Sequence, residues 1–325
     1  MRENSPREKG FGTRRERDTE SSSEGRGEKH DGGRGGPVAP EESKTPGFPE
    51  FAANVQGVSD YERKWIREYL SPFYKNELIL DVVRRVKAGK EATVYACSAH
   101  PSTGRTWVAA KLYRERSLRS SKNVGEYQEG RELLNEDGQT DRPRSGRQNK
   151  AVASNSKRGQ AAAQTSWIMH EFTLLKTLHD QGGDVPEPIE HAPQALLMDF
   201  IGDDADAAPT LSDIEIDVNE AKPLFERVIF NVELLLRLGW VHGDLSAFNI
   251  LYHHGRIKLI DFPQVVDCRN NPKARAIFER DIARVAEYFE RFGQSTDHRR
   301  LAHQLWSKYV AEPEPEPDAE DWGGR

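Results

Sequence analysis

The most informative segment of the chain is Val241–Asn249, whose sequence is VHGDLSAFN. This segment places Asp244 five residues before Asn249. An aspartate in such a loop accepts or orients the proton of an attacking hydroxyl, and an asparagine five residues later turns back to hold a metal ion on phosphates. The same residue types also serve as a cap and a turn residue in ordinary loops. The segment therefore predicts a phosphoryl-transfer loop, with an ordinary loop as the alternative.

A second acidic position lies in the segment Ile257–Pro263, with sequence IKLIDFP. A β-type run ends there in Asp261, twelve residues after Asn249. Such an aspartate chelates the magnesium ion that bridges the β- and γ-phosphates of ATP, although strand-terminal aspartates are also common without that role. The two segments fit H-x-D-L-x-x-x-N and, with proline in place of glycine, D-F-G, which are catalytic sequences of protein kinases.

A lysine and a glutamate complete the predicted catalytic set. Trp107–Lys111 reads WVAAK and fits V-A-x-K on a third strand, where Lys111 would reach the α- and β-phosphates. Glu171 follows on a predicted helix and is the natural ion-pair partner of that lysine. The alternative for both residues is a solvated surface position, which is the commoner fate of lysine and glutamate.

The turn between the first two predicted strands departs from the kinase pattern. It contains one glycine, Gly89, where G-x-G-x-x-G has three. Backbone N–H groups can still cradle phosphate in such a turn, and Lys90 adds positive charge. This turn is weak evidence on its own.

The region after Asp261 is short. No A-P-E follows, and the chain soon enters a helix predicted to start at Pro272, so the activation and peptide-docking segment of ordinary protein kinases is missing. Asp281 stands among apolar residues of that helix. It either faces solvent or turns inward to accept N–H bonds from the Asp244 loop. The inward orientation is favoured, because a loop with several phosphate-facing groups needs support from behind.

The composition limits what the chain can be. Of 325 residues 36% are hydrophobic and 31% charged, with a net charge of -6, which indicates polar tails around an ordinary core. The predicted tails are residues 1–55, disordered and rich in glycine and charge, and residues 312–325, acidic and proline-alternating. The charge excludes a globally basic nucleic-acid coat protein, and two cysteines exclude a disulfide framework. With no apolar run of membrane-spanning length and no secretory signal, the chain is predicted to be cytoplasmic without a membrane partner.

Residues 56–311 are predicted to form one α+β domain of two lobes. The N-lobe, about 56–200, combines a helix at 60–70, a three-strand meander over 81–113, a flexible polar loop at about 135–163, a helix at 167–178 and a strand at 195–201. The C-lobe, about 201–311, is mainly helical, with helices at 220–238, 272–292 and 296–310 and a small hairpin between 249 and 260. A cleft is expected between the lobes.

The stretch from about residue 60 to residue 309 resembles the RIO-type atypical protein kinases. The matching segments are Ala88–Ala92, Val108–Lys111, Trp167–Glu171, Pro186–Pro188, Leu197–Gly202, Ala208–Leu211, His242–Asn249, and Ile260–Asp261 followed by Gln264. Two departures accompany them. Ala88 replaces a hydroxyl-bearing residue of the family's phosphate loop, and Phe262-Pro263 replace smaller residues. No complete winged-helix pattern precedes the core, so the subgroup with that extra domain fits poorly.

The resemblance carries its own implications. It implies a trimmed two-lobed kinase fold with ATP and Mg²⁺ in the cleft, and a flexible loop after Lys111. It implies a hinge from Met198 to Ile201 that contacts adenine. It also implies that Asp261 can itself become phosphorylated.

Three functions remain open from the sequence. The favoured one is an ATP-dependent phosphotransferase of the RIO type, a serine/threonine protein kinase or ATPase that acts on protein or on itself. A small-molecule kinase of the aminoglycoside or choline class shares H-G-D-L-x-x-x-N, but would be expected to have a larger C-terminal substrate region. A kinase-fold scaffold for a ribonucleoprotein, such as a ribosome-related particle, is the third. A surplus of four positive charges in residues 114–158 could contact RNA, although a solvated loop is favoured there.

Overall fold

An antiparallel sheet of five strands forms the frame of the N-lobe. The computed structural model describes residues 53, 55, 57–114 and 157–310, with side chains in the last range from residue 164 onward. In spatial order the strands are β1 (Ile79–Ala88), β2 (Ala92–Ala99), β3 (Trp107–Tyr113), β5 (Ala195–Asp199) and β4 (Pro188–Ala192). The predicted meander of three strands is confirmed, and β4 is an edge strand that the sequence did not reveal.

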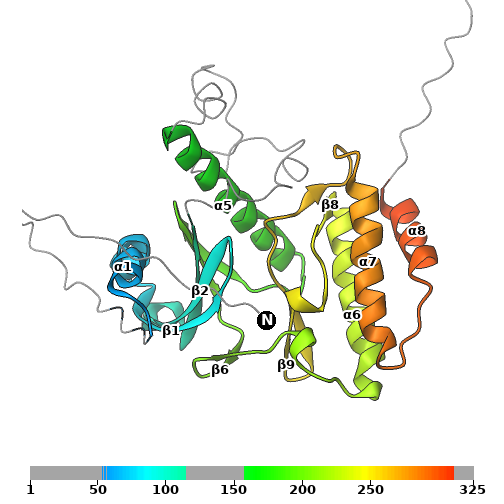
Figure 1. The fold of residues 1–325 in the computed structure, drawn as a ribbon, viewed down its shortest axis with the longest axis horizontal. Helices are drawn as coiled ribbons and strands as arrows, with labels where there is room; N and C mark the ends of the chain where they lie inside the picture. The colour runs from blue at the N-terminus through cyan, green and yellow to red at the C-terminus, as the bar shows by residue number, and fades with distance from the viewer. Residues whose placement is uncertain (1–52, 54, 56, 115–156, 311–325) are drawn as a thin grey trace, which may run out of the picture. The chain divides into compact units, whose positions relative to one another are not determined.

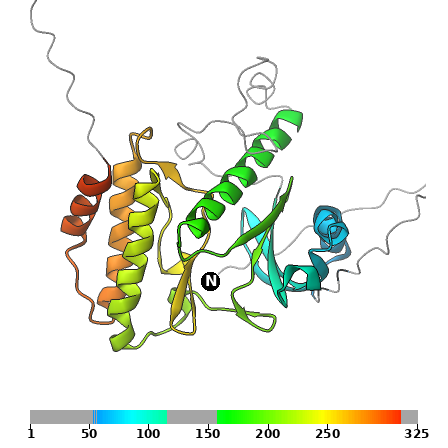
Figure 2. The same ribbon diagram turned by 180° about the vertical axis from the view of Figure 1, so that it is seen from behind.

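Two helices pack on opposite faces of this sheet (Figures 1 and 2). Helix α1 (Asp60–Lys75) is capped at its N-terminus by Ser59, whose side chain accepts a hydrogen bond from the N–H of Glu62. Its buried face joins Leu197 in one core, whereas the adjacent Leu196 belongs to the core that contains helix α5 (Lys157–Asp180). Successive side chains of a strand point to opposite faces, so each helix covers one face.

The disordered N-terminal tail predicted at residues 1–55 includes residues that are in fact part of the folded domain. Ala53 and Val55 are buried in the core under α1, and Arg63 donates hydrogen bonds to both of their carbonyl groups. These two residues therefore belong to the folded domain. The remainder of the tail predicted at 1–55, and the acidic tail predicted at 312–325, lie outside the described residues.

The polar loop predicted at 135–163 is wrong at its C-terminal end. Helix α5 begins at Lys157, ten residues before the predicted start. The cause is local, because Ala161, Ala162 and Ala163 have high helix propensity and extend the helix without any apolar periodicity. Residues 135–156 of the predicted loop lie outside the described part of the chain.

Helices dominate the C-lobe, as predicted. Its long helices are α6 (Val218–Arg237), α7 (Ala274–Glu290) and α8 (His298–Tyr309). Three strand pairs join them: β6 (Gly202–Asp203) with β7 (Asp206–Ala207), β8 (Trp240–Val241) with β11 (Val266–Asp267), and β9 (Ile250–His253) with β10 (Arg256–Leu259). Short 3₁₀ helices cover Pro101–Thr103, Leu211–Asp213 and Ala247–Asn249. The described residues thus form the expected α+β, two-lobed, kinase-like fold.

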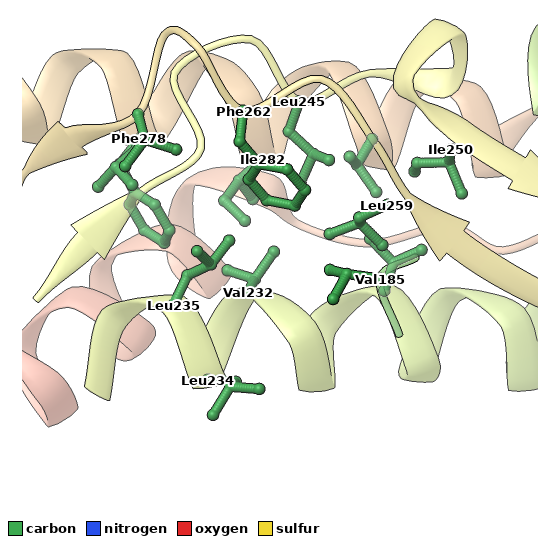
Figure 3. Packing of buried hydrophobic residues seen from close by; sticks show 14 of the residues in the cluster. Val185, Val232, Leu234, Leu235, Leu245, Ile250, Leu259, Phe262, Phe278 and Ile282 are labelled. Carbon is green, nitrogen blue, oxygen red and sulfur yellow. The ribbon is translucent and has the colours of Figure 1, made fainter. Parts of the chain in front are cut away.

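The C-lobe core anchors the loops that carry the predicted catalytic residues. Leu245, next to Asp244, and Phe262, next to Asp261, are both buried in the same cluster as α6 and α7 side chains (Figure 3). The ring of Phe262 also lies 4.7 Å from the ring of His242. The large residue after Asp261, a departure from the family pattern, therefore fills the core and fixes the backbone at Asp261.

No helix among the described residues is both long and apolar enough to cross a bilayer.

Candidate functional site

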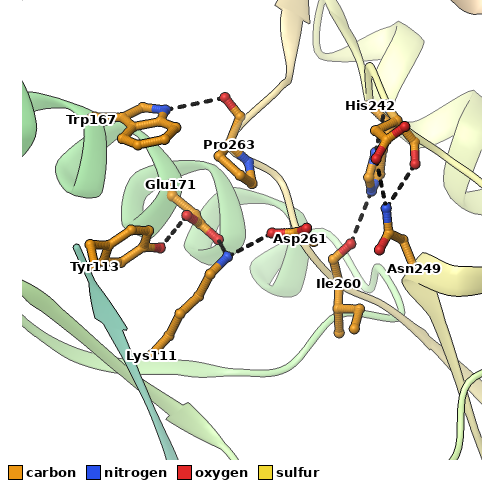
Figure 4. A network of polar contacts seen from close by, with 10 residues as sticks. Lys111, Tyr113, Trp167, Glu171, His242, Asn249, Ile260, Asp261 and Pro263 are labelled. Carbon is orange, nitrogen blue, oxygen red and sulfur yellow. Dashed lines mark hydrogen bonds and ion pairs between the residues drawn. The ribbon is translucent and has the colours of Figure 1, made fainter. Parts of the chain in front are cut away.

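Lys111 joins three parts of the fold. Its side chain is buried, and its Nζ donates to Glu171 Oε1 at 2.7 Å and to Asp261 Oδ1 at 2.9 Å (Figure 4). Lys111 comes from β3, Glu171 from α5 and Asp261 from the loop after β10. The predicted ion pair of Lys111 with Glu171 is present, and the same ammonium group also bonds to the predicted metal-binding aspartate.

Tyr113 completes this cluster and was not predicted. Its hydroxyl donates to Glu171 Oε2, and Lys111 Nζ lies 5.4 Å from the centre of its ring. Each oxygen of Glu171 is therefore bonded, one to Lys111 and one to Tyr113. The spacing contained a signal for this contact, because residues two apart on a strand share a face.

The charges in the cluster stabilise one another. Burial acts to lower the pKa of the Lys111 amine, but the carboxylates of Asp261 and Glu171 outweigh it and raise this pKa well above its ordinary value. Burial acts to raise the pKa of Asp261, but Lys111 outweighs it and the pKa is lowered. Lys111 is thus held as a cation and Asp261 as a carboxylate, the forms that bind phosphate and metal.

Asp261 sits in a backbone conformation that suits its position. Its φ is 70°, in the left-handed region that few non-glycine residues enter and that aspartate tolerates better than most. The chain turns sharply there, directly after Ile260, whose N–H donates to the Asn249 carbonyl at 3.0 Å. The Asp261 side chain is 46% exposed, so an oxygen remains accessible to a cation while the other bonds to Lys111.

Asp244 and Asn249 are held together across their loop. Asn249 Nδ2 donates to the Asp244 carbonyl at 2.8 Å and to Asp244 Oδ2 at 3.3 Å (Figure 4). With its amide nitrogen used in this way, Asn249 presents its Oδ1, a hard oxygen of the kind that magnesium prefers. The loop thus brings the predicted proton acceptor and the predicted metal ligand to one place.

His242 ties this loop to the strand that ends at Asp261. The N–H of Asp244 donates to His242 Nδ1 at 3.3 Å, so Nε2 carries the proton and donates to the Ile260 carbonyl at 3.2 Å. Burial lowers the pKa of His242 despite the opposing charges of Asp281, Asp261 and Asp244. The ring is therefore a neutral structural bridge between the two segments.

Asp281 supports the loop from behind, as predicted. It is buried on α7, and its Oδ2 accepts the N–H of Gly243 at 2.9 Å. Burial raises the pKa of this carboxyl despite the nearby positive groups. Gly243 has a φ of 87°, and a Cβ atom there would lie 1.9 Å from the Gln264 carbonyl oxygen. Only glycine therefore fits at this position.

A second contact at Asp244 was not predicted. Arg284 on α7 donates to Asp244 Oδ1 at 2.9 Å, so the two oxygens of Asp244 are bonded to different partners. No sequence motif marks Arg284. Both side chains are more than a third exposed, so the pair is accessible from solvent.

The residues of the predicted phosphate turn and hinge bond mainly within their own segments. The N–H of Gly89 donates to the Ala92 carbonyl at 2.8 Å, which closes the turn and uses the donor that was expected to face phosphate. Lys90 is exposed. Met198 pairs with Ala109 in the sheet, and the carbonyl of Ile201 accepts the N–H of Ala208 at 2.9 Å. Within the described residues none of the four hydrogen-bonds to Lys111, Asp244, Asn249 or Asp261, so their roles in binding ATP remain predictions.

The burial of His242 leads to a prediction about how the stability of the fold depends on pH. Its folded pKa lies below the ordinary value of 6.5, so below pH 6.5 the unfolded chain binds more protons than the folded one and stability falls. In His242→Gln this contribution is absent. We expect the stability advantage of the wild type over the variant to shrink as the pH falls from about 7.5 to about 5.5. Chemical denaturation at both pH values measures it, and a constant difference would contradict the neutral bridge.

The family model and the similar proteins all point to the same protein family. The family model described as the RIO domain matches residues 93–301. The protein named RIO-type serine/threonine-protein kinase Rio1 of Haloferax volcanii is 30% identical over 212 residues, which cover 65% of this chain and 64% of that protein. The Rio1 of Thermoplasma acidophilum is 32% identical over 142 residues, 44% of this chain and 73% of that one.

Longer relatives match over part of their length. The serine/threonine-protein kinase RIO1 of Chaetomium thermophilum is 30% identical over 265 residues, 78% of this chain but only 47% of that protein. A solved structure of the Rio2 kinase–ADP/Mg²⁺–phosphoaspartate complex from Chaetomium thermophilum is 20% identical, with a TM-score of 0.49, and the match covers 74% of this chain and 65% of that one. Because the family model spans more than half of the sequence, this chain belongs to the RIO domain family.

Proposed function

We propose that this chain is a magnesium-dependent ATP phosphotransferase of the RIO type, which acts as a serine/threonine protein kinase, an ATPase or both. One observation carries the proposal: Lys111 bonds to Asp261, and His242 and Ile260 connect Asp261 to the loop of Asp244 and Asn249. A phosphate-binding cation, a metal-binding carboxylate and a proton acceptor are therefore parts of one bonded network.

The donor set fits Mg²⁺ and ATP. Asp261 and Asn249 would hold the metal, since magnesium takes oxygen ligands and usually one or two carboxylates, and the bound ion would neutralise charge on the phosphates. Lys111 would contact the α- and β-phosphates, with Glu171 holding it in place. We assign the adenine contact to the backbone between Met198 and Ile201, and a phosphate contact to the turn of Gly89 and Lys90. These assignments rest on the family pattern.

Asp244 is the proposed proton acceptor. Its Oδ2 is oriented by Asn249 and its Oδ1 is held by Arg284, so the carboxylate faces an incoming hydroxyl in a defined orientation. A positioned carboxylate of this kind accelerates proton transfer. The acceptor hydroxyl would belong to a protein substrate or to this chain itself, in line with the names of its relatives. A ribosome-related ribonucleoprotein partner and a cytoplasmic location are further parts of the proposal.

Asp261 is also placed to accept the phosphoryl group. A carboxylate oxygen of Asp261 would form a bond to the γ-phosphorus while the bond from that phosphorus to the β-γ bridging oxygen breaks and ADP leaves. Water would then hydrolyse the acyl phosphate, which releases inorganic phosphate and restores the carboxylate. The exposed part of the Asp261 side chain and its closeness to Lys111 support this route. The short region after Asp261 offers no evident platform for a peptide, so we expect slow ATP hydrolysis and weak protein phosphorylation.

The chemistry of the label tests this route. Purified protein is incubated with γ-labelled ATP and magnesium, and then treated with hydroxylamine, which cleaves an acyl phosphate but not phosphoserine. We expect a hydroxylamine-labile label and free phosphate from the wild type, and neither from Asp261→Ala, because that variant lacks the carboxylate that would bind metal and accept phosphate. Asp204→Asn, which changes an exposed aspartate outside the cluster, serves as the matched control.

Three results would contradict the proposal. Magnesium-dependent turnover that persists in Asp261→Ala would remove the metal role. A label that fully resists hydroxylamine, together with rapid transfer to an added protein, would identify a conventional serine/threonine kinase. Label on an added aminoglycoside instead of protein or phosphate would favour the small-molecule kinase.

Removal of the Asp244 carboxylate should affect turnover far more than binding. The base touches no phosphate in the ground state, so Asp244→Ala should lower kcat by about 100- to 10,000-fold, the usual contribution of general-base catalysis. The affinity for ATP should remain within a few-fold. Steady-state kinetics and fluorescent-nucleotide titration measure the two quantities. Equal losses in binding and turnover would place Asp244 in nucleotide binding instead.

A further inference from the structure

A group of metal-ligating side chains lies outside the network described above. Asp203 at the end of β6 meets His253 and His254 at the end of β9, and one potential ligand atom from each side chain lies within 4.8 Å of the other two. Figure 1 shows β6 and β9 in the lower part of the view, and the side chains of Asp203 and His253 make a contact between the ends of these strands. We propose that Asp203, His253 and His254 form a binding site for a divalent transition-metal ion, with Zn²⁺ as the best fit.

Hydrogen bonds within the group leave one ligand atom unused. Asp203 Oδ1 lies 3.2 Å from the Nε2 atoms of both histidines. His254 Nε2 makes a hydrogen bond to that oxygen. His253 Nε2 is closed off from solvent, and apart from its ion-pair contact with this same oxygen it has no hydrogen-bond partner in the described part of the chain. Buried polar nitrogens are rarely left in this state, so the atom is expected to have a partner.

The spacing of the three atoms suits a tetrahedral ion. Zinc bonds histidine nitrogen and carboxylate oxygen at about 2.0–2.1 Å, which at the tetrahedral angle separates two ligand atoms by about 3.3 Å. The two distances between nitrogen and oxygen are both 3.2 Å, and the two nitrogens lie within 4.8 Å of each other. An ion bonded by all three atoms would therefore leave the nitrogen–oxygen distances almost unchanged. Two imidazoles and one carboxylate also favour zinc and its neighbours over magnesium, which prefers oxygen ligands only.

The local backbone presents the two histidines together. Residues His253 and Arg256 pair across the β9–β10 hairpin, so His254 and Gly255 form its two-residue turn, both with positive φ. The rings of His253 and His254 lie 4.1 Å apart. The side chains of Asp203 and His254 are 71% and 73% exposed, whereas that of His253 is 29% exposed. An ion can therefore approach from the exposed side of Asp203 and His254 and keep a water molecule as its fourth ligand.

An ion bound at this site would link two segments of the chain. Asp203 follows the segment Met198–Ile201 by two residues, and β9 begins directly after Asn249. A bound ion would join these two segments by coordinate bonds where the side chains now make one hydrogen bond and one further ion-pair contact. The inference stands on this geometry alone and does not depend on the proposed phosphotransfer.

Cobalt substitution tests the site directly. Co²⁺ takes the place of Zn²⁺ in such sites and gives strong visible absorption only when four-coordinate, so untagged protein is titrated with Co²⁺ and then displaced with Zn²⁺. We expect visible bands with one ion per chain, lost on addition of Zn²⁺ and unaffected by excess Mg²⁺. Asp203→Asn, His253→Ala and His254→Ala should each weaken binding by at least about 10-fold, since loss of even an outer partner of a metal ligand has that effect.

Matched variants separate the site from adventitious binding. Asp204→Asn changes the neighbouring carboxylate, at a left-handed position that asparagine tolerates, and His303→Ala removes an exposed histidine of α8. Both should bind Co²⁺ like the wild type. Circular dichroism confirms that each variant is folded. The inference is overturned if the wild type shows no four-coordinate bands, or if Asp203→Asn and His254→Ala retain them at wild-type affinity.

Discussion

The structure depends on one buried charge, the ammonium group of Lys111. A charge removed from water needs close partners, and removing one partner from a buried pair typically costs about 3–5 kcal/mol. Glu171 and Asp261 supply those partners from α5 and from the C-lobe. The requirement to neutralise Lys111 therefore determines where α5 must lie on the sheet and where the chain must turn after β10. Tyr113 satisfies the remaining oxygen of Glu171, so the pair has one preferred geometry.

The other residues of the site hold the backbone of the Asp261 and Asp244 loops in place. Asp261 is fixed by the burial of Phe262, and the Asp244 loop is fixed by the burial of Leu245. Asp281 holds Gly243 from behind, and the neutral ring of His242 connects the loop to Ile260. These supports are buried, whereas Asp244 and Asp261 remain partly exposed. The fold thus keeps the groups that would meet substrate accessible while their backbone is rigid.

Much of this could be predicted from the sequence, since strong periodicity and spaced motifs are local signals. The meander of β1 to β3, the hairpin after Asn249, the pair of Lys111 with Glu171 and the inward Asp281 were all predicted. Other contacts were not predicted, such as Arg284 with Asp244 and the group of Asp203 with His253 and His254, because no motif links these residues, which lie 40 to 51 positions apart. The start of α5 was missed because alanine-driven helix lacks apolar periodicity. The burial of Ala53 and Val55 was missed because it depends on Arg63.

The central claim is that Lys111 and Glu171 act as one unit that positions phosphate. A double-mutant cycle on kcat/KM for ATP, with Lys111→Met, Glu171→Gln and the combined variant, tests it most directly. If the two residues act together, the combined loss should be close to the larger single loss, with a coupling of at least about 1 kcal/mol. Losses that multiply, so that the coupling is near zero, would show that the ion pair contributes nothing to function and would contradict this account.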